Sequence, residues 1–577
     1  MTSIASLSTA TRLLAHQPST HNTAPAVLAP VAAPRPASLE PVNMQAQAAA
    51  VVAQLETRAA SGSGASIVLQ KAGAAYELTG TKTVAVGTGV TSATQTVDLR
   101  AGAAYAVTGA FGLSSTRGNM KLELLDPKGK VVQSVLGGVG KTSAKLALTA
   151  AASGTYTLRL TGQPIDKTAT TAIYQSYSLS VAQAASRIPK SGDANIDALV
   201  FGGTNSWLHD AGALASVSKT PVKAGVTALN GALTQTVKYA FATADSLKSL
   251  SGADARGAAV MTDVQKIAVA DGFAYLSNVI NLRFEAVSDP AQADIVFGQN
   301  NQSGVSAGYA NAPNQSGGHA EYLFLASDQS TNSSFTNGSY GLTTLLHEIG
   351  HTLGLKHPGN YNAGGGGAPG PFLPTATDNR RFSLMSYHAA PGTNANPQTL
   401  MSYDVLALQF LYGANTDPAS PAALAKHQTT TFTDSWSGLE TLWAPKGAEL
   451  DASQTTRKNI FDFREGAFSS MAMTGGSAIS AGSAASNNVG LAYGSKITRA
   501  TGGSAADAFY TAATGDVTTD GGAGTDTLYL AGKASEWSKS GDVYTRKVAG
   551  KEVAHVAARN IETIAYYDSA KAALIHA

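Results

Sequence analysis

The stretch HEIGHTLGLKHP, residues 347–358, decides how this chain is interpreted. Residues four apart lie on one face of a helix, so His347 and His351 can offer ring nitrogens to a single metal ion. Gly354 can adopt the positive φ that ends a helix sharply, and the chain can then turn back to bring in His357 as a third ligand. Three protein ligands leave a coordination position open, which is typical of a catalytic zinc ion rather than a structural one.

The glutamate beside the first histidine supplies a base. Glu348 lies about 100° round the helix from His347, too far to bind the same ion comfortably but placed to act on a water molecule at the metal. The alternative is a buried helix with hydrogen-bonded histidines. Five fixed positions recur by chance in roughly one of several thousand chains of this length, and three buried histidines are costly without a ligand. The pattern therefore predicts a zinc site.

These residues form the metzincin signature HExxHxxGxxHP, and the surrounding segments resemble serralysins, the secreted bacterial metalloproteases of that clan. The resemblance covers roughly residues 190–415 well and the rest of the chain to the C-terminus loosely. It implies an α+β metzincin zinc-protease domain over residues 190–415. The segments that carry it are GSYGLTTLLHEIGHTLGLKHPGNYNAG (338–364), RRFSLMSY (380–387), PQTLMSYDVLALQFLYGAN (397–415), GDANIDALVFGG (192–203) and ADIVFGQ (293–299).

Two residues of SLMSY acquire roles only through this resemblance. In isolation Met385 reads as a core methionine and Tyr387 as a half-buried aromatic on a turn. The resemblance places Met385 beneath the three histidines, where it packs without binding the metal. It makes Tyr387 a zinc ligand in the resting enzyme that swings away to hydrogen-bond the reaction intermediate, which suits a phenol.

One predicted strand is expected to bind the substrate. AEYLFLAS, residues 320–327, reads as a strand. By the metzincin pattern it is the antiparallel edge of the sheet, which pairs with an extended substrate backbone by strand addition.

Length and composition limit the remaining choices. The 577 residues predict about three or four domains. Forty basic and 38 acidic residues give a net charge of +2, with no basic block for nucleic acid or anionic lipid. No apolar run approaches the roughly 18 residues of a membrane span. The absence of cysteine fits passage through an export channel in the unfolded state and excludes latency by a cysteine on zinc.

The start of the chain lacks the pattern of a cleaved secretory signal. Serralysins leave the cell through type I secretion machinery with an uncleaved C-terminal signal, so the resemblance implies a secreted, extracellular protein. It also implies protein or peptide substrates and a proteinaceous inhibitor as partners.

The remaining segments predict three further regions. Residues 1–64 are rich in Ala, Pro, Ser and Thr, which predicts a disordered tail, propeptide or linker. Residues 65–185 alternate apolar and polar positions in short runs, which predicts an accessory antiparallel β-sandwich. DPKG, residues 126–129, predicts a hairpin turn within it. Residues 416–577 are expected to form a β-sandwich with a shortened parallel β-roll as the secretion domain.

Calcium binding in that last region is doubtful. GGAGTDTLY, residues 521–529, fits the calcium-binding nonapeptide of parallel β-rolls, with Gly522, Gly524 and Asp526 as a weak calcium site. The other candidate, GGSAADAFY (502–510), has alanine where the motif needs its third glycine. A roll needs stacked repeats, so one and a half repeats predict at most weak binding.

The function predicted from these features is a secreted zinc endopeptidase with Glu348 as general base and Tyr387 assisting. One alternative is a protease narrowed to a single partner or to processing itself. The other is a non-catalytic secreted surface or adhesive protein, against which the intact Glu348 argues.

Overall fold

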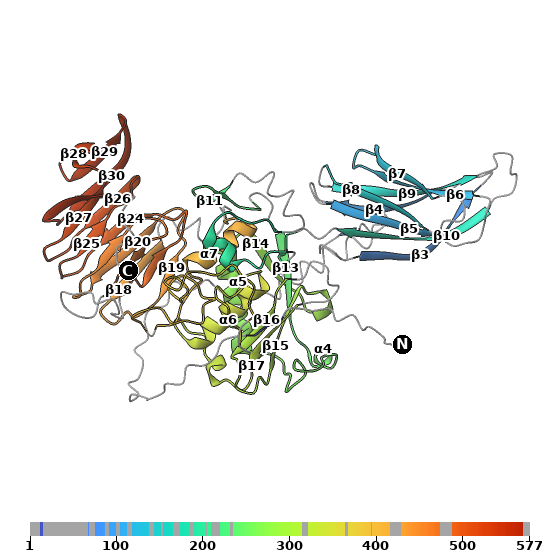
Figure 1. Cartoon of the computed structure of the whole chain (residues 1–577), viewed down its shortest axis with the longest axis horizontal. Helices are drawn as coiled ribbons and strands as arrows, with labels where there is room; N and C mark the ends of the chain where they lie inside the picture. The colour runs from blue at the N-terminus through green and yellow to red at the C-terminus, as the bar shows by residue number, and fades with distance from the viewer. Residues whose placement is uncertain are drawn as a thin grey trace. The chain divides into compact units, whose positions relative to one another are not determined.

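The computed structural model is rich in sheet, contains few helices and is divided into several domains, as the sequence predicts. By compactness it falls into two units, Pro18–Ala184 and the combination of Met1–Gln17 with Ala185–Ala577, which we describe separately (Figure 1). No described helix combines the length and apolar character that a membrane crossing requires. The residues that the structure describes are 12–14, 67–68, 75–86, 92–99, 104–111, 118–137, 143–151, 154–164, 173–183, 188–203, 205–208, 220–230, 235–313, 321–363, 367–393, 395–415, 428–472 and 487–568.

The unit Pro18–Ala184 contains two sheets that share one core. Among the described strands of this unit, the pairs are antiparallel except for β2 with β4. Alternate residues of both sheets point inward, among them Val97, Tyr105 and Leu158. The predicted turn at DPKG joins β6 to β7, with the Gly129 N–H donating to the Asp126 carbonyl at 2.8 Å. The sheets are β3(Ala75–Val86)-β10(Ile173–Gln183)-β5(Ala104–Phe111)-β8(Ser143–Thr149) and β2(Ile67–Val68)-β4(Ser92–Leu99)-β9(Gly154–Pro164)-β6(Gly118–Leu125)-β7(Val131–Gly137).

The region predicted to carry the chemistry has a sheet covered by helices. Four of its strands are parallel, which is typical of a sheet buried on both faces. The strand order is β14(Leu282–Ala286)-β13(Gln235–Phe241)-β15(Ile295–Asn300)-β17(Glu321–Ala326)-β16(Gly308–Asn311)-β1(Arg12–Leu14). The helices are α2(Ala194–Leu199), α4(Ala244–Leu247), α5(Asp263–Val279), α6(Tyr340–Thr352) and α7(Ser402–Tyr412), with short 3-10 turns η1(Pro290–Gln292) and η2(Ser330–Ser333) and a small hairpin β11(Pro221–Lys223)-β12(Val226–Thr227).

One prediction about this sheet is wrong. The segment predicted as the antiparallel edge, 320–327, forms β17, which lies inside the sheet between β15 and β16 and runs parallel to β15. The antiparallel strand is β16, and it packs against α6. Strand direction follows from how the whole chain crosses the sheet. The buried apolar run of β17 suits an interior strand and carries no information about direction.

The region from residue 428 onward is a stack of short strands in which successive turns of the chain lie in register (Figure 1). The ring of Phe461 stacks on that of Phe509 with centroids 4.5 Å apart, and Tyr510 stacks on Tyr529 at 4.2 Å. These contacts repeat from rung to rung, so parallel stacking extends well beyond the two glycine-rich repeats. The shortened roll predicted from sequence is therefore longer than expected.

Three sheets make up this stack. They are β18(Gln428–Thr433)-β20(Ala448–Gln454)-β24(Ile497–Thr501)-β26(Gly515–Asp520)-β30(Lys551–Arg559)-β29(Val543–Val548)-β28(Trp537–Ser540), then β21(Ile460–Asp462)-β25(Ala508–Tyr510)-β27(Thr527–Ala531)-β31(Thr563–Tyr567), and β19(Glu440–Leu442)-β23(Val489–Leu491)-β22(Phe468–Ser469), with a 3-10 turn η3 at Ala534–Glu536.

Most of the predicted tail, residues 1–64, lies outside the described residues. The exception is Arg12–Leu14, which forms β1 beside β16.

Candidate metal centre

Helix α6 places the first two histidines and the glutamate. It begins at the N-cap Ser339, whose hydroxyl accepts the Leu342 N–H at 3.2 Å. From residue 343 to residue 352 every side of the helix is buried, so α6 is a core helix rather than a surface one. Its polar residues are therefore held in fixed positions by packing.

The chain turn after α6 depends on glycine. Gly354 has a φ of +100°, and a Cβ atom at this position would lie 2.6 Å from the Asn205 carbonyl oxygen. Any larger residue would be strained by both effects. Beyond the turn, the Lys356 N–H donates to the Leu199 carbonyl at 2.7 Å, which fixes the strand-like return. This geometry brings His357 back against the helix, as the sequence predicts.

The three histidines meet through the same ring atom. The Nε2 atom of His357 lies 3.1 Å from Nε2 of His347 and 3.1 Å from Nε2 of His351. All three side chains are buried, and one ligand atom from each lies within 4.8 Å of the others.

The opposite ring nitrogens fix the tautomers. The Nδ1 atoms of His347 and His351 lie 3.0 and 2.8 Å from the carbonyl oxygens of Leu384 and Leu355. Nδ1 of His357 lies 3.0 Å from the Tyr361 carbonyl and 2.9 Å from Asn362 Oδ1. Since a carbonyl oxygen only accepts, each Nδ1 carries the proton and each Nε2 presents a lone pair. Three converging lone pairs repel one another unless a cation lies between them, so the residues fit a metal ion.

The electrostatics agree with a ligand role. Burial lowers the pKa of His351 well below its usual value, and the other two histidines add to that effect. Burial likewise lowers the pKa of His357 to about 4. Both rings are therefore neutral at pH 7, the form in which imidazole binds zinc.

Glu348 lies beside this cluster without joining it. Its side chain is buried, and burial raises its carboxyl pKa well above the ordinary value. Neither carboxylate oxygen has a hydrogen-bond partner among the described residues. A Cβ atom on Gly308 of β16 would lie 3.0 Å from Glu348 Cγ, so the carboxylate sits between the helix and this strand. A buried carboxyl with a raised pKa is typical of a general base.

Met385 lies under α6. It is fully buried, and a Cβ atom on Gly350 would lie 2.8 Å from its sulfur. The glycine between the two helical histidines therefore allows the close approach of the turn that carries Met385. The resemblance implies this position for Met385, which packs beneath the histidines and does not bind the metal.

Tyr387 lies over the third histidine. Its ring centroid is 4.6 Å from that of His357 and 4.7 Å from the stacked ring of Tyr361. Burial, followed by the nearby Glu348, raises the pKa of the Tyr387 phenol, which therefore stays protonated and can donate a hydrogen bond.

Sequence reasoning missed several residues that hold this arrangement. Asp378 accepts the Tyr361 hydroxyl at 2.6 Å and the Ser386 hydroxyl at 2.8 Å, which ties the loop after His357 to the segment that carries Tyr387. Asp404 on α7 accepts the backbone N–H groups of Leu384 and Met401. No local pattern marked these acids, because their partners lie on other segments.

Lys356 was missed as well. Its buried ammonium donates to the carbonyl oxygens of Ala198 at 2.5 Å and Pro371 at 2.7 Å. Burial lowers its pKa to about 8. Lys356 thus joins two segments that flank the metal centre.

The residues predicted to bind calcium lie on one turn of the C-terminal stack. Gly522 and Gly524 have positive φ values of 84° and 129°. A Cβ atom on Gly524 would lie 2.6 Å from the Ala505 carbonyl, so the glycines allow close stacking of turns. Asp526 is buried; its Oδ1 accepts the Asp507 N–H at 2.7 Å, while Oδ2 has no hydrogen-bond partner among the described residues.

Side-chain oxygens connect successive rungs at this position. The Asp507 carboxylate accepts the Asn459 N–H at 2.6 Å, and the Glu562 carboxylate accepts the Asp526 N–H at 2.7 Å. We call Asn459, Asp507, Asp526 and Glu562 the polar ladder. Burial raises the pKa of Asp526, and Glu562 and Asp520 add to the shift. The ladder uses carboxylate oxygens that a calcium site would need.

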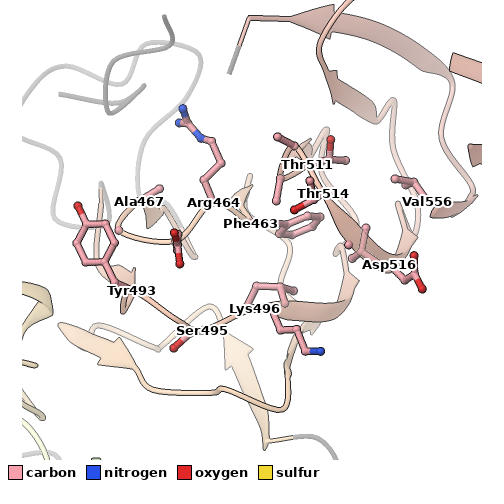
Figure 2. A pocket seen from close by; sticks show the side chains of 17 residues that line it. Phe463, Arg464, Ala467, Tyr493, Ser495, Lys496, Thr511, Thr514, Asp516 and Val556 are labelled. Atoms are coloured by element: carbon pink, nitrogen blue, oxygen red, sulfur yellow. The ribbon is translucent and has the colours of Figure 1, made fainter. Parts of the chain in front are cut away.

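A cavity of about 600 Å³ lies in the C-terminal stack, away from the histidines (Figure 2). Its lining includes the charged residues Arg464, Glu465, Lys496 and Asp516, two of each sign. It contains none of the residues of the metal centre.

The comparisons with known proteins point to one group. The chain is 29% identical over 290 residues to the metallopeptidase AprA of Pseudomonas marginalis, covering 47% of this chain and 58% of the relative. It is 31% identical over 224 residues to the serralysin of Proteus mirabilis (33% and 45%) and 30% identical over 251 residues to that of Photorhabdus luminescens (40% and 49%). The chain thus spans about half the length of these relatives. The resemblance to serralysins is confirmed.

Two other comparisons add nothing to this. No protein-family model matches the chain. Among solved structures, PliG of Aeromonas hydrophila, a periplasmic inhibitor of g-type lysozyme, is 18% identical and covers 20% of this chain and 95% of that one, with a TM-score of 0.15. That score is too low to indicate a shared fold.

Proposed function

We propose that this serralysin-like chain is a secreted zinc-dependent endopeptidase that hydrolyses peptide bonds of extracellular proteins. The convergence of three Nε2 lone pairs, each fixed by a proton on the opposite nitrogen, is the observation that supports this most strongly. Similarity to metallopeptidases over roughly half the chain supports the same conclusion.

The zinc ion would be held by His347, His351 and His357, because one ligand atom from each lies within 4.8 Å of the others. A zinc ion bound there supplies Lewis-acid activation of water and of the scissile carbonyl. Calcium would bind, if at all, at Gly522, Gly524 and Asp526.

Glu348 acts as the general base and then as the general acid of the proposed reaction. Its buried carboxylate takes a proton from the attacking water and then delivers it to the leaving amine. The pKa raised by burial makes the carboxylate a stronger base than an exposed glutamate.

Tyr387 stabilises charge. Its protonated phenol, held over His357 and stacked on Tyr361, donates a hydrogen bond to the oxyanion that forms on the substrate carbonyl. Asp378 keeps Tyr361 in place and so positions Tyr387.

The test uses the full chain and an unfolded protein such as casein as substrate. We expect stoichiometric zinc by elemental analysis, hydrolysis that a chelator abolishes and zinc restores, and loss of at least about 100-fold in kcat for Glu348→Gln with zinc retained. Glu285→Gln, on an exposed strand position, is the matched control. Zinc-loaded protein that cuts no substrate would refute the proposal in favour of a non-catalytic surface protein.

The same digest separates general from narrow specificity. Hydrolysis of casein supports a broad endopeptidase, whereas cutting confined to one native protein or to the chain itself supports the narrowed alternative. Export through type I secretion machinery and capture by a proteinaceous inhibitor belong to the same proposal.

A further inference from the structure

Helix α6 carries a second polar side chain whose hydrogen bonding is incomplete. The hydroxyl of Thr344 is buried and has no hydrogen-bond partner among the described residues. A threonine inside a helix commonly donates to a carbonyl three or four residues earlier. The other two threonines of α6 do so, since Thr343 donates to the Ser339 carbonyl at 3.2 Å and Thr352 to the Ile349 carbonyl at 2.8 Å. Thr344 is the exception in this helix.

Thr344 lies beside the proposed base. It precedes Glu348 by four residues, about one helical turn, so the two side chains project from the same face of α6. Both reach the same point on strand β16, because a Cβ atom on Gly308 would lie 3.0 Å from Glu348 Cγ and 3.2 Å from Thr344 Cγ2. The two side chains therefore lie next to each other against one glycine.

This arrangement gathers buried oxygen atoms that need partners. Neither carboxylate oxygen of Glu348 has a hydrogen-bond partner among the described residues, and the same holds for the Thr344 hydroxyl. Burying such atoms unpaired is costly, and ordered water satisfies buried polar groups that no protein group reaches. A buried water makes two to four hydrogen bonds. The Thr344 hydroxyl and the two Glu348 oxygens offer up to three.

We propose that Thr344 is a positioning residue for the base, with its hydroxyl joined to the Glu348 carboxylate by hydrogen bonds through one buried water molecule. The link holds the carboxylate in one orientation for the attacking water. A hydroxyl suits this role because it can both donate and accept. The link therefore persists when the reaction adds a proton to Glu348 and when it removes that proton. This inference rests on the proposed function for the role of Glu348.

The test uses three substitutions in the full chain. Thr344→Val keeps the shape of the side chain and removes the hydroxyl, whereas Thr344→Ser keeps the hydroxyl. Thr343→Val is the matched control, because the Thr343 hydroxyl is already paired with the carbonyl oxygens of Ser339 and Pro397, each at 3.2 Å.

The first measurement is independent of activity. Urea denaturation with a chelator present compares the effect of Thr344→Val in the parent and in Glu348→Ala. Removing a hydroxyl that has no partner leaves stability unchanged or raises it. We expect Thr344→Val to raise the unfolding equilibrium constant at least about tenfold in the parent and to have little effect in Glu348→Ala, whereas Thr343→Val acts equally in both. Equal effects of Thr344→Val in the two backgrounds would overturn the link.

The second measurement uses the zinc-loaded proteins and a fluorogenic peptide. We expect Thr344→Val to lower kcat at least about tenfold with KM nearly unchanged, and Thr344→Ser to keep most of the parental kcat. A parental kcat in Thr344→Val, or an equal loss in Thr344→Ser, would overturn the positioning role. If the zinc-loaded parent cuts no peptide, the proposed function is refuted, while the denaturation result still decides the link.

Discussion

The Asp404 carboxylate on α7 accepts the backbone N–H of Leu384 at 2.7 Å, and the carbonyl of that same residue lies 3.0 Å from Nδ1 of His347. One residue of the turn thus connects a buried acid to a metal-binding ring. The same carboxylate also accepts the Ser383 hydroxyl at 2.7 Å and the Met401 N–H at 2.9 Å.

Replacing this acid should weaken both the fold and the metal centre. Asp404→Ala leaves two buried N–H groups and a hydroxyl without an acceptor, so we expect a loss of roughly 2–5 kcal/mol in the free energy of unfolding. We also expect weaker zinc binding, measured by competition with a chromogenic chelator. Asp404→Asn keeps an acceptor and should lie between the variant and the parent. Unchanged zinc affinity in Asp404→Ala would contradict the connection through Leu384.

Removing the Tyr387 hydroxyl should lower kcat and change KM little. We expect Tyr387→Phe to lower kcat roughly 100-fold with a small change in KM, since the hydrogen bond is made to charge that develops in the transition state. Steady-state kinetics with a fluorogenic peptide measures this. Tyr361→Phe keeps the stacked ring and should cost less. A Tyr387→Phe enzyme with parental kcat would remove this residue from the mechanism.

Glu440 on β19 should make stability depend on pH. Burial raises the pKa of its carboxyl to about 7, and its Oε1 has no hydrogen-bond partner among the described residues. The folded state therefore keeps a proton that the unfolded state releases above about pH 4.5, its ordinary value, so the free energy of unfolding falls as the pH rises from there to about 7.

Glutamine does not titrate, so the free energy of unfolding of Glu440→Gln does not fall over this pH range. We expect the variant to gain stability relative to the parent between pH 5 and 8 in urea denaturation. Glu285→Gln, on an exposed strand position, serves as the control. Parallel pH profiles for Glu440→Gln and the parent would show that the carboxyl titrates normally.

The polar ladder should hold the C-terminal stack without calcium. Asp526→Ala removes the acceptor of the buried Asp507 N–H, so we expect a loss of about 1–3 kcal/mol of stability in the absence of calcium. Added calcium should leave the melting temperature of the parent unchanged. A clear calcium-dependent rise in Tm that Asp526→Ala abolishes would establish the metal site and contradict this prediction.

The sequence predicts the histidine cluster well because its information is local. His347 and His351 are one helical turn apart, and Gly354 sets the return that brings His357 back. Asp378 and Asp404 are different, since each becomes part of the centre only when distant segments meet. No spacing rule reveals such contacts.

The two errors in the predicted fold have a related cause. Periodicity marks residues 320–327 as a strand but gives neither its direction nor its neighbours. It therefore cannot show that β17 lies inside the sheet and that the antiparallel strand next to it is β16. In the C-terminal stack, the glycine motifs revealed two rungs only. The others are held by ring stacking such as that of Phe461 on Phe509, which shows only once the rungs are in register.

The three Nδ1 hydrogen bonds have a consequence for how a metal-binding centre can form in this chain. Their acceptors belong to the helix return at Leu355, the loop at Tyr361 and the turn at Leu384, so all three segments must be assembled before the lone pairs converge. We expect tight uptake of a metal ion to require that this part of the chain has finished folding. A half-folded chain would hold the ion poorly, so we expect metal binding and folding of these three segments to be coupled.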